Sequence, residues 1–280
     1  MQITIYRKNI SNTGKQKKDD TQWYTYMLYY YSMIKLRPKI YGIVGVLCAV
    51  LCWEVLSANS QSSAMPSFIH ILQTFFVLAL ADSFRAHIIA SLQVVLSGIG
   101  IAIVFGLSIG VMAAYRKRFK YAIMPIIECL RGISALTLFP LLIVIMGLGS
   151  ASQIFVIFWT SWPPVLLSVL DSLEIGATLE SEAARMDGAG EWKILTAIRF
   201  PLALPYILTG IRVGFSGGWV SLIAAEMLGA SNGLGFFLLW SAQSFDFNEV
   251  YATILTIGLI GGAINWMMIV FYSYLRRIYG

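Results

Sequence analysis

The sequence predicts an all-α integral membrane protein. Hydrophobic residues make up 58% of the 280 residues and charged residues only 12%, whereas soluble domains carry about 25% charged residues. The mean hydropathy is +0.74. Several runs of roughly 18 or more residues carry almost no charge, which is long enough to cross about 30 Å of hydrocarbon. These observations favour membrane-spanning helices over a soluble core.

About six runs are expected to span the membrane, and the third is expected to be irregular. Pro125, Gly132 and Pro140 interrupt that run, so the helix should be kinked or partly unwound there. The six predicted spans cover residues 40–57, 86–115, 122–147, 151–171, 205–229 and 250–275.

The basic residues are concentrated on one side of the predicted membrane. Eight lysines and arginines precede the first span, four lie between spans two and three, and three lie between spans four and five. Loops rich in lysine and arginine stay in the cytoplasm, so both termini should be cytoplasmic, as should the loop between spans four and five. This asymmetry accounts for the net charge of +6 without a nucleic-acid partner.

The basic segment before the first span divides the chain in two. Residues 1–39 are expected to form a cytoplasmic N-terminal extension, and its aromatic stretch, residues 23–31, should lie among the lipid headgroups. Residues 40–280 are expected to form the transmembrane domain.

A polar stretch rich in small residues, about residues 175–201, connects spans four and five. We expect a short helix over residues 180–187, a turn at residues 187–190, and a second helix over residues 191–199. Pro201 should end the second helix.

The residue types in the first of these helices suit a docking surface. Glu182 lies near the helix start, where the helix dipole favours negative charge. Ala183, Ala184 and Gly188 carry little bulk, so another protein could approach their backbone closely, and Gly188 can adopt a positive φ. An ordinary connecting loop would explain the same residues.

The spacing of this stretch resembles the EAA coupling motif of ABC importer permeases. Residues 203–212 and 224–235 narrow the resemblance to the branch that imports nitrate, sulfonates, taurine or bicarbonate, and the likeness extends over about residues 65–275. One departure lies at residues 132–137, where family members often have a Pro-rich stretch after the arginine equivalent to Arg131. The motif itself is carried by Glu182, Ala183, Ala184, Arg185, Gly188, Ile198 and Pro201.

This resemblance implies a type I importer-like permease fold in the cell inner (plasma) membrane, with a cytoplasmic coupling helix. It also implies a homodimer, an extracytoplasmic substrate-binding protein, and two separate ABC ATPase subunits into which the coupling helix docks. The chain contains no G-x4-G-K-[ST] sequence, so ATP and Mg²⁺ would belong to the ATPase subunits, and this chain would hold no cofactor and no catalytic residue. The implied coupling residues are Glu182, Ala183, Ala184, Arg185, Gly188 and Pro201, with Arg185 paired to Glu182 or to the partner.

Charged residues inside the spans are expected to face the bundle interior or a water-filled cavity. Glu128 and Arg131 are spaced i, i+3; they form a neutralising pair, or Arg131 helps to stabilise an anionic substrate. Glu226 is expected to be a gate or an inter-span hydrogen-bonding group, and Arg212 could pair with it only in a bent span. These four residues are the candidates for the translocation pathway. The three cysteines all fall within spans and only two histidines occur, so no metal site is expected.

The main alternative is a secondary carrier or channel subunit that is not driven by ATP, which would often show an inverted repeat. We find no such repeat. A membrane enzyme is a weaker alternative, because the buried ionisable residues form no nucleophile–base set. The solute stays open among sulfonate, taurine, nitrate, bicarbonate and an uncharged molecule, with Arg131 favouring an anion slightly.

Overall fold

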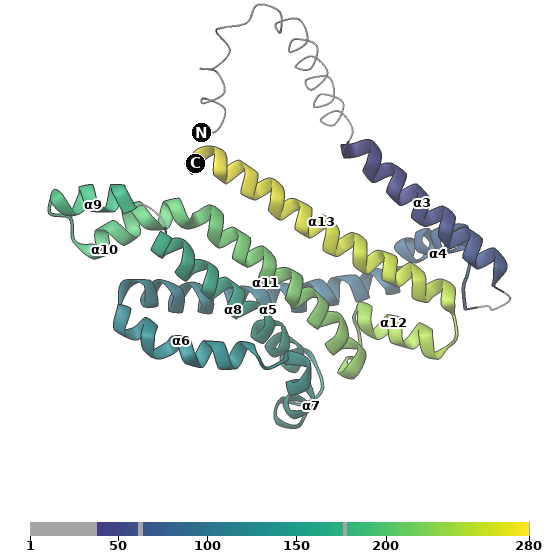
Figure 1. The fold of residues 1–280 in the computed structure, drawn as a ribbon. Helices are drawn as coiled ribbons and strands as arrows, with labels where there is room; N and C mark the ends of the chain where they lie inside the picture. Colours follow the sequence, from purple (N-terminus) through teal and green to yellow (C-terminus); the bar gives the residue numbers. More distant parts are fainter. Residues whose placement is uncertain (1–37, 61–63, 176–177, 280) are drawn as a thin grey trace, which may run out of the picture. The chain divides into compact units, whose positions relative to one another are not determined.

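The computed structural model describes residues 38–60, 64–175 and 178–279, and every regular element in these ranges is a helix (Figure 1). The aromatic segment at residues 23–31 lies outside the described residues. Contacts divide the chain into two units, residues up to Phe68 and residues from Ile69 onward.

The first unit contains α3 (Pro38–Asn59), which covers the first predicted span. The segment that follows α3 returns to it through side-chain hydrogen bonds. Trp53 Nε1 donates to the Pro66 carbonyl over 3.2 Å. Both oxygens of Glu54 accept hydrogen bonds, one from Ser67 Oγ at 2.7 Å and one from the Phe68 backbone N–H at 3.0 Å. Within this unit, the Glu54 carboxylate therefore connects α3 to the segment that follows it.

In the second unit, the long helices are α5 (Asp82–Tyr115), α8 (Ser150–Ile175), α11 (Phe200–Gly229) and α13 (Phe247–Tyr279). Among the described residues four helices are long and apolar enough to cross a membrane, or five if one bent pair counts as a single span. This is fewer than the six predicted spans, because the Val44–Asn59 stretch of α3 falls among the shorter apolar helices.

The third predicted span is broken, as expected. It consists of α6 (Lys117–Arg131) and α7 (Ala135–Met146), which meet at an angle of 89°. Pro125 and Pro140 lie inside these helices, so the break lies at residues 132–134 and not at either proline. Trp159 Nε1 donates to the Ile133 carbonyl over 3.1 Å, which gives the interrupted backbone a partner from α8.

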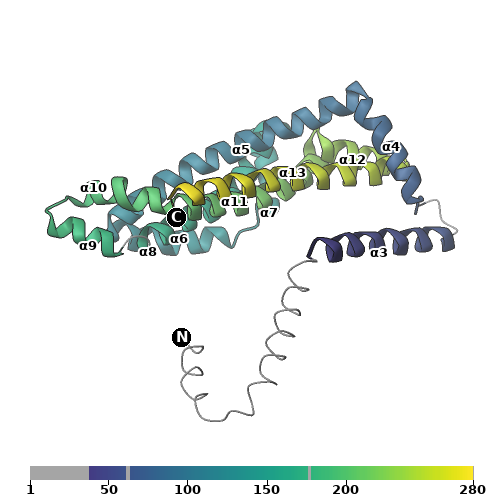
Figure 2. The same cartoon turned by 90° about the horizontal axis from the view of Figure 1, so that it is seen from above.

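The core forms where α5 and α11 pack against α8, and α13 lies along α11 (Figure 2). Small residues allow the close approach. A Cβ added to Gly110 of α5 would lie 2.7 Å from Val169 Cγ1 of α8. Serines on α8 add polar links to α11, because Ser161 Oγ donates to the Gly214 carbonyl at 2.9 Å and Ser168 Oγ to the Tyr206 carbonyl at 2.7 Å.

The shorter helices connect these spans. They are α4 (Phe68–Leu80), α12 (Leu234–Gln243), and, in the loop after α8, α9 (Thr178–Met186), α10 (Glu191–Ile194) and the π-helical turn η1 (Leu195–Arg199). The loop helices lie at one end of the bundle and α12 at the other, since α11 runs from η1 to the turn before α12 (Figure 1).

Candidate functional site

The predicted docking helix is present as α9, which projects at one end of the bundle (Figure 1). Its observed bounds, Thr178–Met186, differ from the predicted residues 180–187 by two residues at the start and one at the end. Glu180 lies in the first turn, where the free amides of the helix favour an acidic side chain.

Gly188 ends this helix in the way that its residue type predicts. Its φ is +81°, and two hydrogen bonds close the helix end, from the Gly188 N–H to the Arg185 carbonyl at 3.0 Å and from the Ala189 N–H to the Ala184 carbonyl at 2.9 Å. This is a Schellman motif, which requires a left-handed residue at the position of Gly188. A Cβ added at Gly188 would meet nothing within 4 Å, so within this chain the glycine is required for its conformation alone.

Pro201 does not end the second helix, and that prediction was wrong. The backbone is helical without interruption from Glu191 to Gly229, through α10, η1 and α11, and Pro205 lies inside α11 and does not begin it. A proline has no N–H to donate and its ring clashes with the carbonyl four residues earlier. A wider π-helical turn over Leu195–Arg199 lies just before Pro201. Such turns change the backbone hydrogen-bond pattern, which allows the helix to continue through the proline.

Two side-chain contacts hold α9 against the segment that leads into α11. Ser181 is 1% exposed and accepts a hydrogen bond from Arg199 Nε at 3.1 Å. Arg185 pairs with Glu191, not with Glu182, through Nε to Oε1 at 2.6 Å. This hydrogen bond raises the pKa of the Arg185 guanidinium. Two side chains of α9, Ser181 and Arg185, therefore connect this helix to the segment that leads into α11.

The opposite face of α9 is exposed and largely apolar. Leu179 is 76% exposed and Met186 89% exposed, and Glu182 and Ala183 are exposed between them. These residues are spaced i, i+3, i+4 and i+7, so they share one side of the helix. Sequence reasoning selected Glu182 and Ala183 but missed Leu179 and Met186, although apolar residues seven apart in a polar loop helix were a visible signal.

A different polar cluster lies at the other end of α11. Glu226 is 2% exposed; its carboxyl oxygens accept hydrogen bonds from Ser91 Oγ of α5 at 2.6 Å and from the Gly235 N–H of α12 at 2.7 Å. Ser91 Oγ in turn accepts from the Leu234 N–H at 2.8 Å, and His87 Nδ1 accepts from the Gly233 N–H at 3.0 Å. Glu226 thus makes the predicted inter-span hydrogen bonds, which join α5, α11 and the start of α12.

Of the other pathway candidates, Glu128 and Arg131 form the predicted pair. Their side chains are about half exposed and 2.6 Å apart, between Oε2 and Nη2, directly before the break between α6 and α7. Arg212 is half-buried on α11 and does not pair with Glu226. Among the described residues its guanidinium has no salt bridge.

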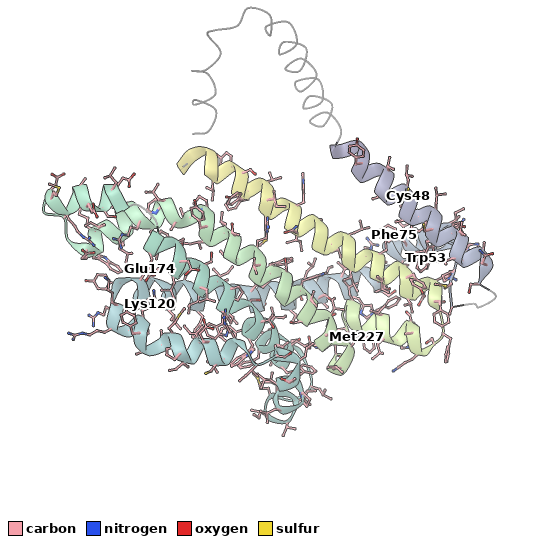
Figure 3. The ribbon with its side chains drawn as sticks, in the orientation of Figure 1. Cys48, Trp53, Phe75, Lys120, Glu174 and Met227 are labelled. Atoms are coloured by element: carbon pink, nitrogen blue, oxygen red, sulfur yellow. The ribbon has the colours of Figure 1, made fainter. Side chains whose placement is uncertain are left out.

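A further salt bridge sits at the end of the bundle that carries α9. Lys120 of α6 and Glu174 of α8 point toward one another in Figure 3, with 2.5 Å between Nζ and Oε1. This salt bridge joins α6 to α8 near the loop that follows α8.

The fold and the loop together define a class of protein, a helical membrane protein whose bundle bears a short exposed helix at one end. Comparison with known proteins gives the family. Residues 102–278 match the family model described as "Binding-protein-dependent transport system inner membrane component".

Two relatives match most of the chain. The taurine transport system permease protein TauC of Escherichia coli (strain K12) is 32% identical over 225 residues, which are 78% of this chain and 82% of TauC. The nitrate import permease protein NrtB of Synechocystis sp. (strain ATCC 27184 / PCC 6803 / Kazusa) is 30% identical over 241 residues, 82% of this chain and 86% of NrtB.

A solved structure has the same fold. A chain of the MetNI methionine ABC transporter in an inward-facing conformation superposes with a TM-score of 0.62 at 17% identity, covering 72% of this chain and 98% of that chain. The predicted permease fold is thereby confirmed. The chain belongs to the family of binding-protein-dependent transport system inner membrane components, and it is a membrane-spanning permease subunit of an ABC importer.

Proposed function

We propose that this permease is driven by a separate ABC ATPase, which binds the exposed face of α9 formed by Leu179, Glu182, Ala183 and Met186. The observation that carries the proposal is the contrast between the two sides of α9. One side is fastened to α10 and η1 through Arg185 and Ser181, and the other offers apolar surface to solvent. When the ATPase subunits close on ATP, the docked α9 would move with them and would transmit that movement to α11.

Copurification tests this proposal. The chain is tagged, membranes are solubilised gently, and the bound proteins are identified by mass spectrometry. We expect a P-loop ATPase and an extracytoplasmic binding protein. Ala183→Trp should abolish ATPase capture, because the indole would stand in the centre of the docking face. Ala122→Trp, which changes another exposed alanine, on α6, is the matched control. A chain that purifies alone and moves solute in liposomes without ATP would instead be a secondary carrier.

The proposed assembly contains two copies of this chain, two ATPase subunits holding ATP and Mg²⁺, and one binding protein on the outer side of the inner membrane. The proposed orientation places the termini and α9 in the cytoplasm. It is supported by charge, because the basic turn between α5 and α6 lies at the same end as α9, where Tyr115 of α5 contacts Trp192 of α10. Cysteine labelling of Met186→Cys from each side of the membrane would test this orientation.

For the solute, we propose a small anion of the kind carried by the related taurine and nitrate permeases. Arg131 supports this, because it lies at a break in a membrane helix, where a transport pathway can reach the backbone. Arg131→Gln should raise the KM for anion uptake by roughly tenfold or more, since a hydrogen bond to a charged group contributes about 1.5–3 kcal/mol. Arg131→Lys should retain part of the uptake. Equal uptake by both variants and the wild type would show that Arg131 only neutralises Glu128.

A further inference from the structure

The turn between α5 and α6 carries three consecutive basic residues, Arg116, Lys117 and Arg118, and all three are exposed. None of them takes part in a salt bridge among the residues that the structure describes. They differ in this from the next basic residue, Lys120, which pairs with Glu174. Three positive charges thus stand together, and no acidic group in the described part of the chain lies within salt-bridge distance of them.

These side chains surround a cavity. A hollow of about 470 Å³ is lined by Arg116, Lys117 and Arg118, with Met112 and Phe119 as its apolar walls. The backbone creates it, because Arg116 alone separates the two helices; its φ of −119° and ψ of 99° are extended, and α6 starts at the next residue. A cavity with a cationic rim and apolar walls suits a ligand that has an anionic head and an apolar body.

The aromatic residues beside the cavity place it at the depth of the lipid headgroups. Tyr115 and Trp192 contact edge to face, with ring centroids 5.3 Å apart, and both are about half exposed. Exposed tyrosine and tryptophan concentrate at the membrane–water interface. Tyr115 is the last residue of α5 and immediately precedes Arg116, while Met112 lies one turn earlier, toward the hydrocarbon.

We propose that this basic pocket binds the phosphate-bearing headgroup of an anionic phospholipid. The two guanidinium groups match a phosphate with paired N–H donors, and Lys117 adds a third positive charge. Met112 and Phe119 provide apolar surface for the glycerol and the start of the acyl chains. Because Trp192 belongs to α10, a lipid bound here would also steady the segment through which α9 connects to α11.

Lipid binding to the purified full-length chain tests the proposal without any ATPase. Native mass spectrometry counts the phosphatidylglycerol and phosphatidylcholine molecules retained from mixed micelles. The wild type should retain phosphatidylglycerol selectively. Replacing all three basic residues by glutamine should weaken that binding roughly a hundredfold, because each basic side chain contributes about fivefold to binding an anionic surface.

Two further variants distinguish lipid binding in the pocket from a general effect of the protein's charge. Met112→Trp keeps every charge but fills the cavity, and it should also abolish selective retention. Replacing Lys35, Arg37 and Lys39 by glutamine removes the same number of charges from another basic segment of the sequence and should leave retention unchanged. Equal losses in the two triple variants, or normal binding by Met112→Trp, would overturn the proposal.

The same experiment distinguishes a lipid headgroup from free phosphate as the ligand of the pocket. Millimolar inorganic phosphate should not displace the lipid, since it lacks the apolar body that Met112 and Phe119 contact. Displacement by phosphate, with binding of phosphate in the absence of lipid, would replace the lipid site by an aqueous phosphate site. Loss of ATPase capture in the triple glutamine variant with unchanged lipid retention would assign the pocket to a protein interface and refute the lipid proposal.

Discussion

Two roles are proposed for Gly188, and substitutions to alanine and to asparagine distinguish them. One role is conformational, since φ is +81° in the turn that ends α9. The other is steric, since the open space around its Cα would let an ATPase subunit approach. Alanine adds one methyl group but resists this φ, which costs about 1–2 kcal/mol. Asparagine tolerates the conformation better and adds a larger side chain.

Hydrogen exchange of the Ala189 amide measures the conformational role. That amide donates to the Ala184 carbonyl and closes the helix end. A strain of about 1–2 kcal/mol changes the ratio of closed to frayed helix ends by a factor of roughly 5–30. Gly188→Ala should therefore accelerate exchange of the Ala189 amide by that factor, and Gly188→Asn should change it less. Unchanged exchange in Gly188→Ala would refute the assignment of the Schellman motif.

Transport coupled to ATP hydrolysis measures the steric role. If the ATPase approaches closely, Gly188→Asn should impair uptake although its helix end stays closed, and Gly188→Arg should abolish uptake. Normal expression and import by Gly188→Arg would mean that the coupling role proposed for this loop is wrong. Uptake that fails in Gly188→Ala but persists in Gly188→Asn would leave Gly188 only its conformational role.

Substitutions of Glu226 and Gly110, each with a comparison variant, test the membrane-embedded part of the chain. Glu226→Ala leaves the buried Ser91 hydroxyl and Gly235 N–H without their acceptor. It should therefore lower the free energy of unfolding by about 2–4 kcal/mol, measured as a lower Tm in detergent. Glu226→Gln should lower the Tm less, and equal decreases in the two variants would argue against the hydrogen bonds. Gly110→Leu should prevent folding, because its side chain would start 2.7 Å from Val169 Cγ1. Gly100→Leu is the control, since a Cβ there meets nothing within 4 Å, and folded yields that match would contradict the packing argument.

The features that could be predicted from the sequence depend on neighbouring residues. The position of α9 follows from a helix-forming stretch between turn signals, and the conformation of Gly188 follows from the few residues around it, so both predictions are confirmed. The pairing of Glu128 with Arg131 was also predictable, because residues three apart on a helix face the same side.

The predictions that failed concern how distant segments accommodate one another. Pro201 was expected to end a helix, yet it lies within helical backbone. The third span is broken as expected, but the break lies at residues 132–134, while Pro125 and Pro140 lie inside α6 and α7. A local π-helical turn precedes Pro201. Arg185 was expected to pair with Glu182, three residues away, or with the partner protein, but the turn at Gly188 brings Glu191 within hydrogen-bonding distance.

The sequence by itself determined the all-helical membrane fold, the break in the third span and the place of α9. These rest on hydropathy, residue spacing and turn chemistry, which act over a few residues. Only the tertiary structure decided that Glu226 meets Ser91, 135 residues away, and that Tyr115 meets Trp192 beside the basic pocket. Such contacts arise when spans remote in the sequence pack together to bury their small and polar residues, and no local pattern records which spans will be neighbours.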